Sequence, residues 1–138
     1  RQFQQVLTVR APRQGLHDIT RDVTACAAAS DIATGLLTLF IGHTSASLTI
    51  QEDADSAVLR DLEDFFAALA PESATRYRHN SEGADDMPAH IRSALTQTSL
   101  SIPMRDSVMV LGAWQGLYLF EHRRQPQSRQ LTLHIIGD

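Results

Sequence analysis

Hydrophobic residues alternate with polar ones along much of the chain, which is the pattern of half-buried strands. A loose alternation predicts a first strand over residues 3–10, and a run that is apolar on both faces predicts an interior strand over residues 35–42. Alternation resumes over residues 46–51, after a polar insert. Further strands are predicted at residues 100–104, 108–112, 115–121 and 129–137. The pattern therefore predicts about seven strands.

Helical spacing appears between the first two of these strands. Ile19, Val23 and Cys26 recur at helical intervals and predict a helix over residues 20–29, with Thr20 as its N-cap. Because Cys26 lies on the apolar face of this helix, we expect it in the hydrophobic core.

Two more helices are predicted in the middle of the chain. The clearest apolar stripe begins after Asp53 or Asp55, either of which suits an N-cap, and ends at Pro71. A polar connection without periodicity follows, and it is long for a passive loop. The third helix is predicted from near Met87 to near Thr96.

The order of these elements indicates the fold class. Strands and helices follow one another as β-α-β-β-α-α-β-β-β-β, without the strict alternation of a parallel α/β fold. The 138 residues provide for one hydrophobic core but leave no room for a second domain. We therefore expect a single α+β domain over residues 1–138.

Composition narrows the range of functions. The 16 acidic and 12 basic residues give a formal charge of −4, which disfavours nucleic-acid binding. Every basic residue is an arginine, so lysine Schiff-base chemistry and a Walker-type phosphate lysine are excluded. The single cysteine precludes an intrachain disulfide, and no apolar run reaches the ~18 residues of a membrane span. We expect a cytoplasmic protein that crosses no membrane.

The six histidines keep metal or acid–base chemistry open. His79 and His90 share one short segment with Glu82, Asp85 and Asp86. Asp86 and His90 are spaced i, i+4, so they project from one face near the start of the third predicted helix. Imidazole and carboxylate groups together suit zinc or manganese, whereas each member alone is also typical of a helix cap or a solvated surface.

Two other segments place polar groups at strand ends. Residues 43–47, His-Thr-Ser-Ala-Ser, interrupt two apolar strands and suit a phosphate site, a metal site or an ordinary turn. Residues 121–129 predict a hairpin whose tip carries His122 and three arginines, which suit phosphate oxygens or a merely charged turn. His134, inside the last predicted strand, is expected to be structural, and the context of His17 favours neither role.

Three segments of the sequence together resemble a known family. They are His43 to Ile50 with Glu52-Asp53-Ala54-Asp55, Tyr77 to Ile91, and Gly112 to Leu119 with Glu121-His122-Arg123. In order and spacing they resemble the YjbQ-like family, also called the secondary thiamin-phosphate synthase family, over essentially the whole chain. The chain departs from the family pattern at Ala113, where threonine is usual, and at Asp106-Ser107, where the turn usually contains glycine.

The resemblance implies a compact α+β fold of about seven or eight mostly antiparallel strands packed with two or three helices, assembled as a homotrimer. It also implies thiamin phosphate synthase activity, in which hydroxymethylpyrimidine pyrophosphate is joined to hydroxyethylthiazole phosphate and pyrophosphate is released. The family pattern, carried over to this sequence, includes His43, Ser45, Ser47, His79, Glu82, Asp85, Asp86, His90, Trp114, Gln115, Glu121, His122, Arg123, Ser128 and Arg129.

The first functional hypothesis is therefore a transferase of the thiamin-phosphate type. Such a reaction needs charge neutralisation on the leaving pyrophosphate. Asp85 and Asp86 would hold a magnesium ion, although such hard-metal sites are usually poor in histidine. The phosphorylated substrate would be bound by Ser45, Ser47, Gln115, Arg123, Ser128 and Arg129.

The second hypothesis starts from the histidines. His79, His90 and His122 would bind a zinc-like ion in a hydrolase or lyase of unknown substrate, with Glu82 or Asp86 as the general base. His43 is a further catalytic candidate, and the sequence leaves open whether the four histidines converge within one subunit. A third hypothesis is a trimeric module that binds a small anionic metabolite without turnover.

Overall fold

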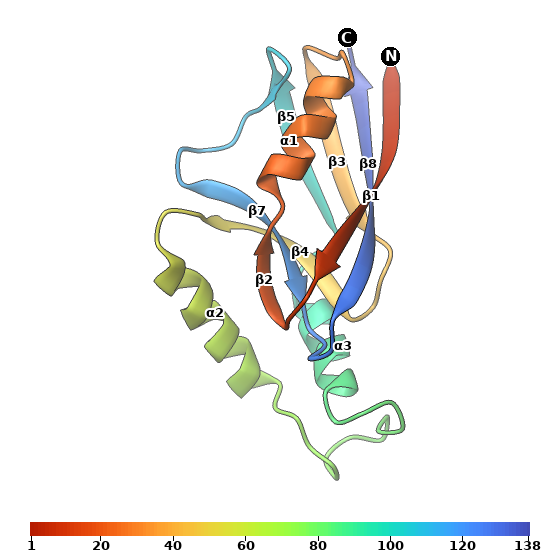
Figure 1. Ribbon diagram of the computed structural model, residues 1–138, viewed down its shortest axis with the longest axis vertical. Helices are drawn as coiled ribbons and strands as arrows, with labels where there is room; N and C mark the ends of the chain where they lie inside the picture. Colours follow the sequence, from red (N-terminus) through yellow and green to blue (C-terminus); the bar gives the residue numbers. More distant parts are fainter.

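Two antiparallel β-sheets and three helices make up the computed structural model, which describes residues 1–138 (Figure 1). The strands are β1 (Gln2–Ala11), β2 (Gly15–Asp18), β3 (Gly35–Ile41), β4 (Ala46–Glu52), β5 (Ser99–Arg105), β6 (Val108–Met109), β7 (Gln115–Glu121) and β8 (Gln127–Gly137). The helices are α1 (Thr20–Ala29), α2 (Ser56–Leu69) and α3 (Asp86–Leu95). The larger sheet has the order β1-β8-β3-β5-β6 and the smaller one β2-β7-β4. All pairings are antiparallel, so the predicted α+β class is confirmed.

The structure contains one strand that the hydrophobic pattern does not reveal, and it shortens another. β2 is only four residues long, which is too short for alternation to be recognised, and it gains its place by pairing with β7. The strand predicted over residues 108–112 is wrong beyond Met109. There the Val110 N–H still donates to the Pro103 carbonyl, but Pro103 has no N–H to return the bond, and the Leu111 N–H turns back to the Met109 carbonyl.

The helix starts differ from prediction in one case. Asp55 caps α2 by accepting a hydrogen bond of 2.9 Å from the Ala57 N–H, as one of the two predicted alternatives requires. The predicted capping role of Thr20 is wrong, because Ile19 is at the N-cap position and Thr20 is the first helical residue, whose N–H is accepted by Asp18 Oδ1 at 2.9 Å. The Thr20 hydroxyl instead accepts a hydrogen bond of 2.8 Å from the Leu117 N–H and so ties the first turn of α1 to β7.

One hydrophobic core fills the space between the sheets and α1. It includes the inward-facing residues of the larger sheet, such as Leu37, Leu131 and Leu133, all fully buried. Cys26 is 6% exposed within the same core, as its position on the apolar face of α1 predicts. A second, smaller cluster joins α2 to the β2–β7 sheet. None of the helices is long and apolar enough to cross a membrane.

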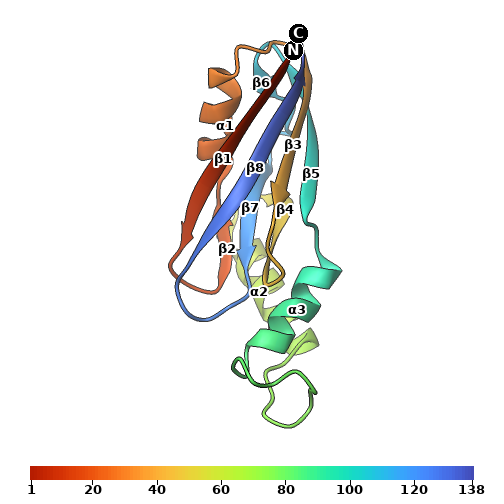
Figure 2. The same cartoon turned by 90° about the vertical axis from the view of Figure 1, so that its right-hand side faces the viewer.

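Helix α3 lies at the end of the molecule opposite the two chain termini, as Figures 1 and 2 show. The long connection from α2 to α3, residues 70–85, extends beyond the strands at this end, and the β7–β8 hairpin reaches the same region. The fold therefore brings three segments that carry the candidate chemistry to one end of the molecule: the β3–β4 connection, the start of α3 and the tip of the β7–β8 hairpin.

Candidate metal centre

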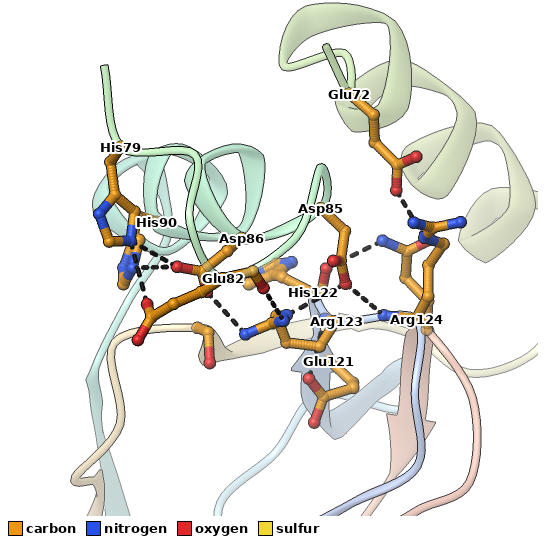
Figure 3. Close-up of polar contacts among 12 residues, drawn as sticks. Glu72, His79, Glu82, Asp85, Asp86, His90, Glu121, His122, Arg123 and Arg124 are labelled. Carbon is orange, nitrogen blue, oxygen red and sulfur yellow. Dashed lines mark hydrogen bonds and ion pairs between the residues drawn. The ribbon is translucent and has the colours of Figure 1, made fainter. Parts of the chain in front are cut away.

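The start of α3 is the centre of the candidate site. Asp86 is the first residue of the helix, and His90 lies one turn later on the same face, as the i, i+4 spacing predicts. His79 comes from the connection before the helix. Asp86 Oδ2 lies 2.6 Å from His79 Nε2 and 3.3 Å from His90 Nε2. One ligand atom from each of these residues lies within 4.8 Å of the others, so the three side chains converge on a common point (Figure 3).

A backbone carbonyl fixes the orientation of His90. His90 Nδ1 lies 3.0 Å from the Thr44 carbonyl oxygen, in the connection between β3 and β4. Because a carbonyl can only accept, Nδ1 carries the hydrogen, and the lone pair of the neutral ring is on Nε2, which points at Asp86. This arrangement, with the second nitrogen held by a carbonyl, is the one in which histidines bind metal ions.

The aspartate of this group is buried, whereas the two histidines are accessible. The Asp86 side chain is 4% exposed, whereas those of His90 and His79 are 32% and 43% exposed. Burial alone would raise the pKa of Asp86, but hydrogen bonds from neighbouring side chains and the charge of Arg123 lower the pKa overall. The hydrogen bond to Asp86 raises the pKa of His79 above its usual value. The site therefore combines an ionised buried carboxylate with two imidazoles that solvent or a ligand can reach.

Glu82 lies at the rim of this group. Its Oε2 is 3.1 Å from His79 Nε2, and its side chain is 65% exposed. A carboxylate in this position can accept a proton from a molecule bound at the site, which is the role that the sequence predicts for Glu82.

Arg123 lies on the opposite side of Asp86 from the histidines (Figure 3). Its guanidinium donates to Asp86 Oδ1 at 2.7 Å, to Asp85 Oδ2 at 3.0 Å and to the Glu82 carbonyl at 2.9 Å. Burial acts to raise the pKa of Asp85, but hydrogen bonds from the Arg124 N–H and from Arg123 lower it overall. Neither aspartate is a solvated surface group, and Arg123 binds these two carboxylates where the sequence suggests phosphate.

The structure does not bring His122 into this group. His122 is fully buried, and its Nε2 lies 2.8 Å from Ser47 Oγ. Thr96 Oγ1 lies 2.6 Å from Ser47 Oγ and 2.7 Å from the Arg92 carbonyl. Since the Thr96 hydroxyl has one proton and the carbonyl can only accept, Ser47 donates to Thr96 and accepts from His122 Nε2. Burial, with Arg92 and Arg129 nearby, lowers the pKa of His122 to about 3, so the ring is neutral.

A second buried group lies around the base of the β7–β8 hairpin. Arg129 binds Glu121 through two hydrogen bonds of 2.6 Å, and both residues are buried. Arg129 also donates to Ser45 Oγ at 3.0 Å. His43 Nε2 accepts the Gln130 N–H at 3.1 Å. Burial and the charge of Arg129 lower the pKa of His43. These predicted substrate and catalytic residues are thus hydrogen-bonded to one another and to the backbone.

The remaining predicted residues lie apart from the histidine group. Gln115 is at the end of β7 away from Glu121, where its side chain accepts the Gly112 N–H at 2.8 Å. Trp114, next to it, is 64% exposed. Ser128 is exposed at the start of β8, and His134 contacts Gln4 at 3.1 Å on the sheet surface, as expected for a structural histidine.

Two hollows flank the candidate centre. One of about 240 Å³ lies between α3 and the β3–β4 connection and is lined by His43, Thr44, His90, Ser93, Ala94 and Thr98. The other, about 530 Å³, is lined only by polar residues and proline or glycine: Glu82, Gly83, Asp85, Arg123, Arg124, Gln125 and Pro126. A larger hollow, about 820 Å³, runs along α1 and contains no histidine. His90 lines the smaller of the two flanking hollows, and Glu82 lines the other.

A family model described as UPF0047 protein YjbQ-like matches residues 5–138. The chain belongs to this family. The UPF0047 protein sll1880 of Synechocystis is 50% identical over 138 residues, which are 100% of this chain and 94% of that protein. The UPF0047 protein YjbQ of Salmonella typhimurium is 39% identical over 137 residues, which are 99% of each chain. The family resemblance of the sequence motifs is thus confirmed.

Two solved structures share the fold. A conserved hypothetical protein of Thermus thermophilus matches with a TM-score of 0.85 at 36% identity, over 96% of this chain and 99% of that one. A protein of Sulfolobus solfataricus matches with a TM-score of 0.91 at 24% identity, over 100% and 99%, which shows the fold alone. The Sulfolobus protein is described as being of unknown function.

Proposed function

We propose that this chain binds one zinc-like divalent ion through His79, Asp86 and His90 and uses it in hydrolysis or lyase chemistry on a small anionic substrate. The observation that carries the proposal is the convergence of two imidazole nitrogens and a carboxylate oxygen within 4.8 Å of one another. His122, the third ligand suggested by the sequence, is replaced in this proposal by Asp86.

The donor set fits zinc better than magnesium. Two histidines and one carboxylate are the protein ligands of many catalytic zinc sites, which leave a further position for water or substrate. Magnesium prefers oxygen ligands and retains several waters. The exposure of His79 and His90 leaves the outer side of the group open, as a catalytic rather than a purely structural site requires.

Each protein group has a distinct part in this proposal. When bound, the ion supplies Lewis acidity toward water and toward an oxygen of the substrate. Glu82, exposed and 3.1 Å from His79, takes the proton released by the attacking water. The Thr44 carbonyl keeps His90 Nε2 available. The polar hollow beside Glu82 leaves room for a small substrate.

The contacts of the arginines favour this proposal over the thiamin-phosphate-type transfer that the family resemblance implies. That reaction requires donors for a pyrophosphate group. Arg123 and Arg129, its main candidates, are both engaged by buried carboxylates. The transferase therefore becomes the competing outcome of the experiment.

Elemental analysis of protein purified without added metal tests the proposal. We expect about one zinc per chain, and loss of most of it in His90→Ala and Asp86→Asn. His17→Ala, which removes a histidine whose Nε2 contacts the Arg13 carbonyl at 2.7 Å, is the matched control and should retain the wild-type content. A metal-free wild-type protein that still makes thiamin phosphate with magnesium would contradict the zinc proposal and support the transferase.

The proposal includes the homotrimer that the resemblance implies. The outward-facing side chains of four neighbouring strands in the larger sheet contain no Asp, Glu, Lys or Arg across three rows of the register. They are Gln2, Gln4, Val6, Thr132, His134, Ile136, Leu36, Thr38, Phe40, Ser99, Ser101 and Pro103. Depletion of charge marks the centre of protein interfaces, so we assign this uncharged face to contact between copies of the chain.

A further inference from the structure

We infer that Arg123 is a positioning residue that sets the geometry of the metal ligands by fixing Asp86, an inference that rests on the proposed metal site. The two oxygens of the Asp86 carboxylate have different partners. Oδ1 accepts a hydrogen bond of 2.7 Å from Arg123 Nη1, while Oδ2 faces His79 and His90. The arginine therefore determines which oxygen is presented to the metal and in which direction.

The remaining donors of Arg123 hold the segment that delivers the other groups of the site. Nη2 donates to the Glu82 carbonyl at 2.9 Å, and Nε donates to Asp85 Oδ2 at 3.0 Å. These contacts bind the backbone just before α3 to the end of β7. Since His79 and Glu82 belong to this segment, one guanidinium restrains the two groups that come from the connection as well as the aspartate on the helix.

The anchoring of Arg123 makes it suitable for this role. Its own N–H donates to Glu121 Oε2 at 3.0 Å, and Glu121 is buried and bound by Arg129. The next N–H, that of Arg124, donates to the same Asp85 oxygen at 2.9 Å. The guanidinium is therefore held by a rigid strand end on one side and by two carboxylates on the other.

Gly83 shows that the local backbone is shaped around the same contacts. Its φ of +108° is unfavourable for residues with a side chain, and a Cβ there would lie 3.0 Å from Asp85 Oδ1 and 3.7 Å from Arg123 Nη2. Gly83→Ala therefore disturbs the contacts between Arg123 and this segment without altering a charged residue, which provides an independent test.

Groups that orient metal ligands contribute about 10–100-fold to metal affinity. The test is a titration of zinc and cobalt into the metal-stripped full chain, with zinc affinity measured against a chromophoric chelator. We expect Arg123→Gln to weaken zinc binding by about 10–100-fold and to shift the visible absorption of bound cobalt, which reports ligand geometry. Arg123→Lys keeps the positive charge but loses the several N–H donors of the guanidinium, so its zinc affinity should lie between those of Arg123→Gln and wild type.

Arg124→Gln is the matched control. Arg124 has the same charge, and its side chain contacts Glu72 at 2.9 Å rather than a candidate ligand, so we expect affinity within about twofold of wild type. An equal loss in Arg124→Gln would show that charge alone acts, and it would overturn the positioning role. The positioning role would also be overturned if Arg123→Gln bound zinc with wild-type affinity and gave an unchanged cobalt spectrum.

Further outcomes separate this inference from the proposed function. If wild type binds neither zinc nor cobalt, the proposed metal site fails and the inference fails with it. If wild type binds zinc and the Arg123 variants bind it as tightly as wild type does, the inference alone fails. Should Arg123→Gln not fold, Arg123→Lys and Gly83→Ala decide the matter: a loss of about fivefold or more supports positioning, and affinity within about twofold of wild type overturns it.

Discussion

Protons and metal compete for the same nitrogen of His79. Its Nε2 lies 2.6 Å from Asp86 Oδ2, and this hydrogen bond raises the pKa of the imidazole. Metal ions bind the neutral ring, so a proton must leave His79 before the proposed ligand set is complete. The contact between His79 and Asp86 is therefore also the one that makes metal binding depend on pH.

We predict that zinc affinity rises with pH through the raised pKa of His79. The stability of the metal-free protein should change in the opposite direction. A histidine whose folded pKa exceeds its unfolded value stabilises the fold below the unfolded pKa of about 6.5, and this contribution is lost as pH rises through the folded pKa. Zinc titrations and denaturant unfolding in a chelator, at pH values on both sides of that range, measure the two trends.

The variant His79→Gln is the control for both trends. It should bind zinc weakly at every pH and should lack the stability change assigned to His79. A zinc affinity that falls as pH rises in the wild-type protein would contradict the role of His79 as a ligand.

At the scale of the elements, one buried serine connects β4, the end of β7 and the last turn of α3. Ser47 Oγ lies 2.8 Å from His122 Nε2 and 2.6 Å from Thr96 Oγ1. None of these hydrogen bonds involves His79, Asp86 or His90, so the network supports the packing of the elements.

We predict that Ser47→Ala lowers the free energy of unfolding by about 1–3 kcal/mol, because it leaves the His122 N–H buried without a partner. Zinc affinity should remain within about twofold of wild type. Ser128→Ala, at an exposed position of β8, is the control and should change stability by less than about 0.5 kcal/mol. Urea unfolding measures the stability of both variants. A large loss of zinc binding with unchanged stability would instead place Ser47 in the active site.

The elements also show how much the sequence can predict. The three helices, all strands except β2, and the common face of Asp86 and His90 follow from local periodicity, and the structure confirms them apart from the shortened β6. The position of His79 could not be predicted, because it lies in a connection without periodicity that is held by hydrogen bonds from Arg123, far away in the sequence. Likewise, β7 is buried along almost its whole length, so alternation does not reveal that His122 faces the interior.

At the scale of the whole molecule, the uncharged face of the larger sheet is the proposed contact between copies. Phe40 is 47% exposed in one outer row of this face, and Leu36 and Ile136, in the other outer row, are 41% and 52% exposed. Exposed apolar side chains without surrounding charges are typical of interface centres.

We predict that Phe40→Glu shifts a trimer toward monomers, because association would bury the new carboxylate without a partner. Phe65→Glu is the matched control: Phe65 is 59% exposed on α2, away from this sheet, and its replacement should leave the oligomeric state unchanged. Sedimentation velocity of wild type and both variants measures the outcome. Equal sedimentation of wild type and Phe40→Glu would contradict this assignment of the interface.

The most direct test of the metal centre is anomalous X-ray diffraction at the zinc edge, from crystals of protein purified without added metal. The proposal predicts one strong peak about 2.0–2.2 Å from His79 Nε2, His90 Nε2 and an oxygen of Asp86. The absence of a peak between these residues, or a peak bound by other side chains, would contradict it.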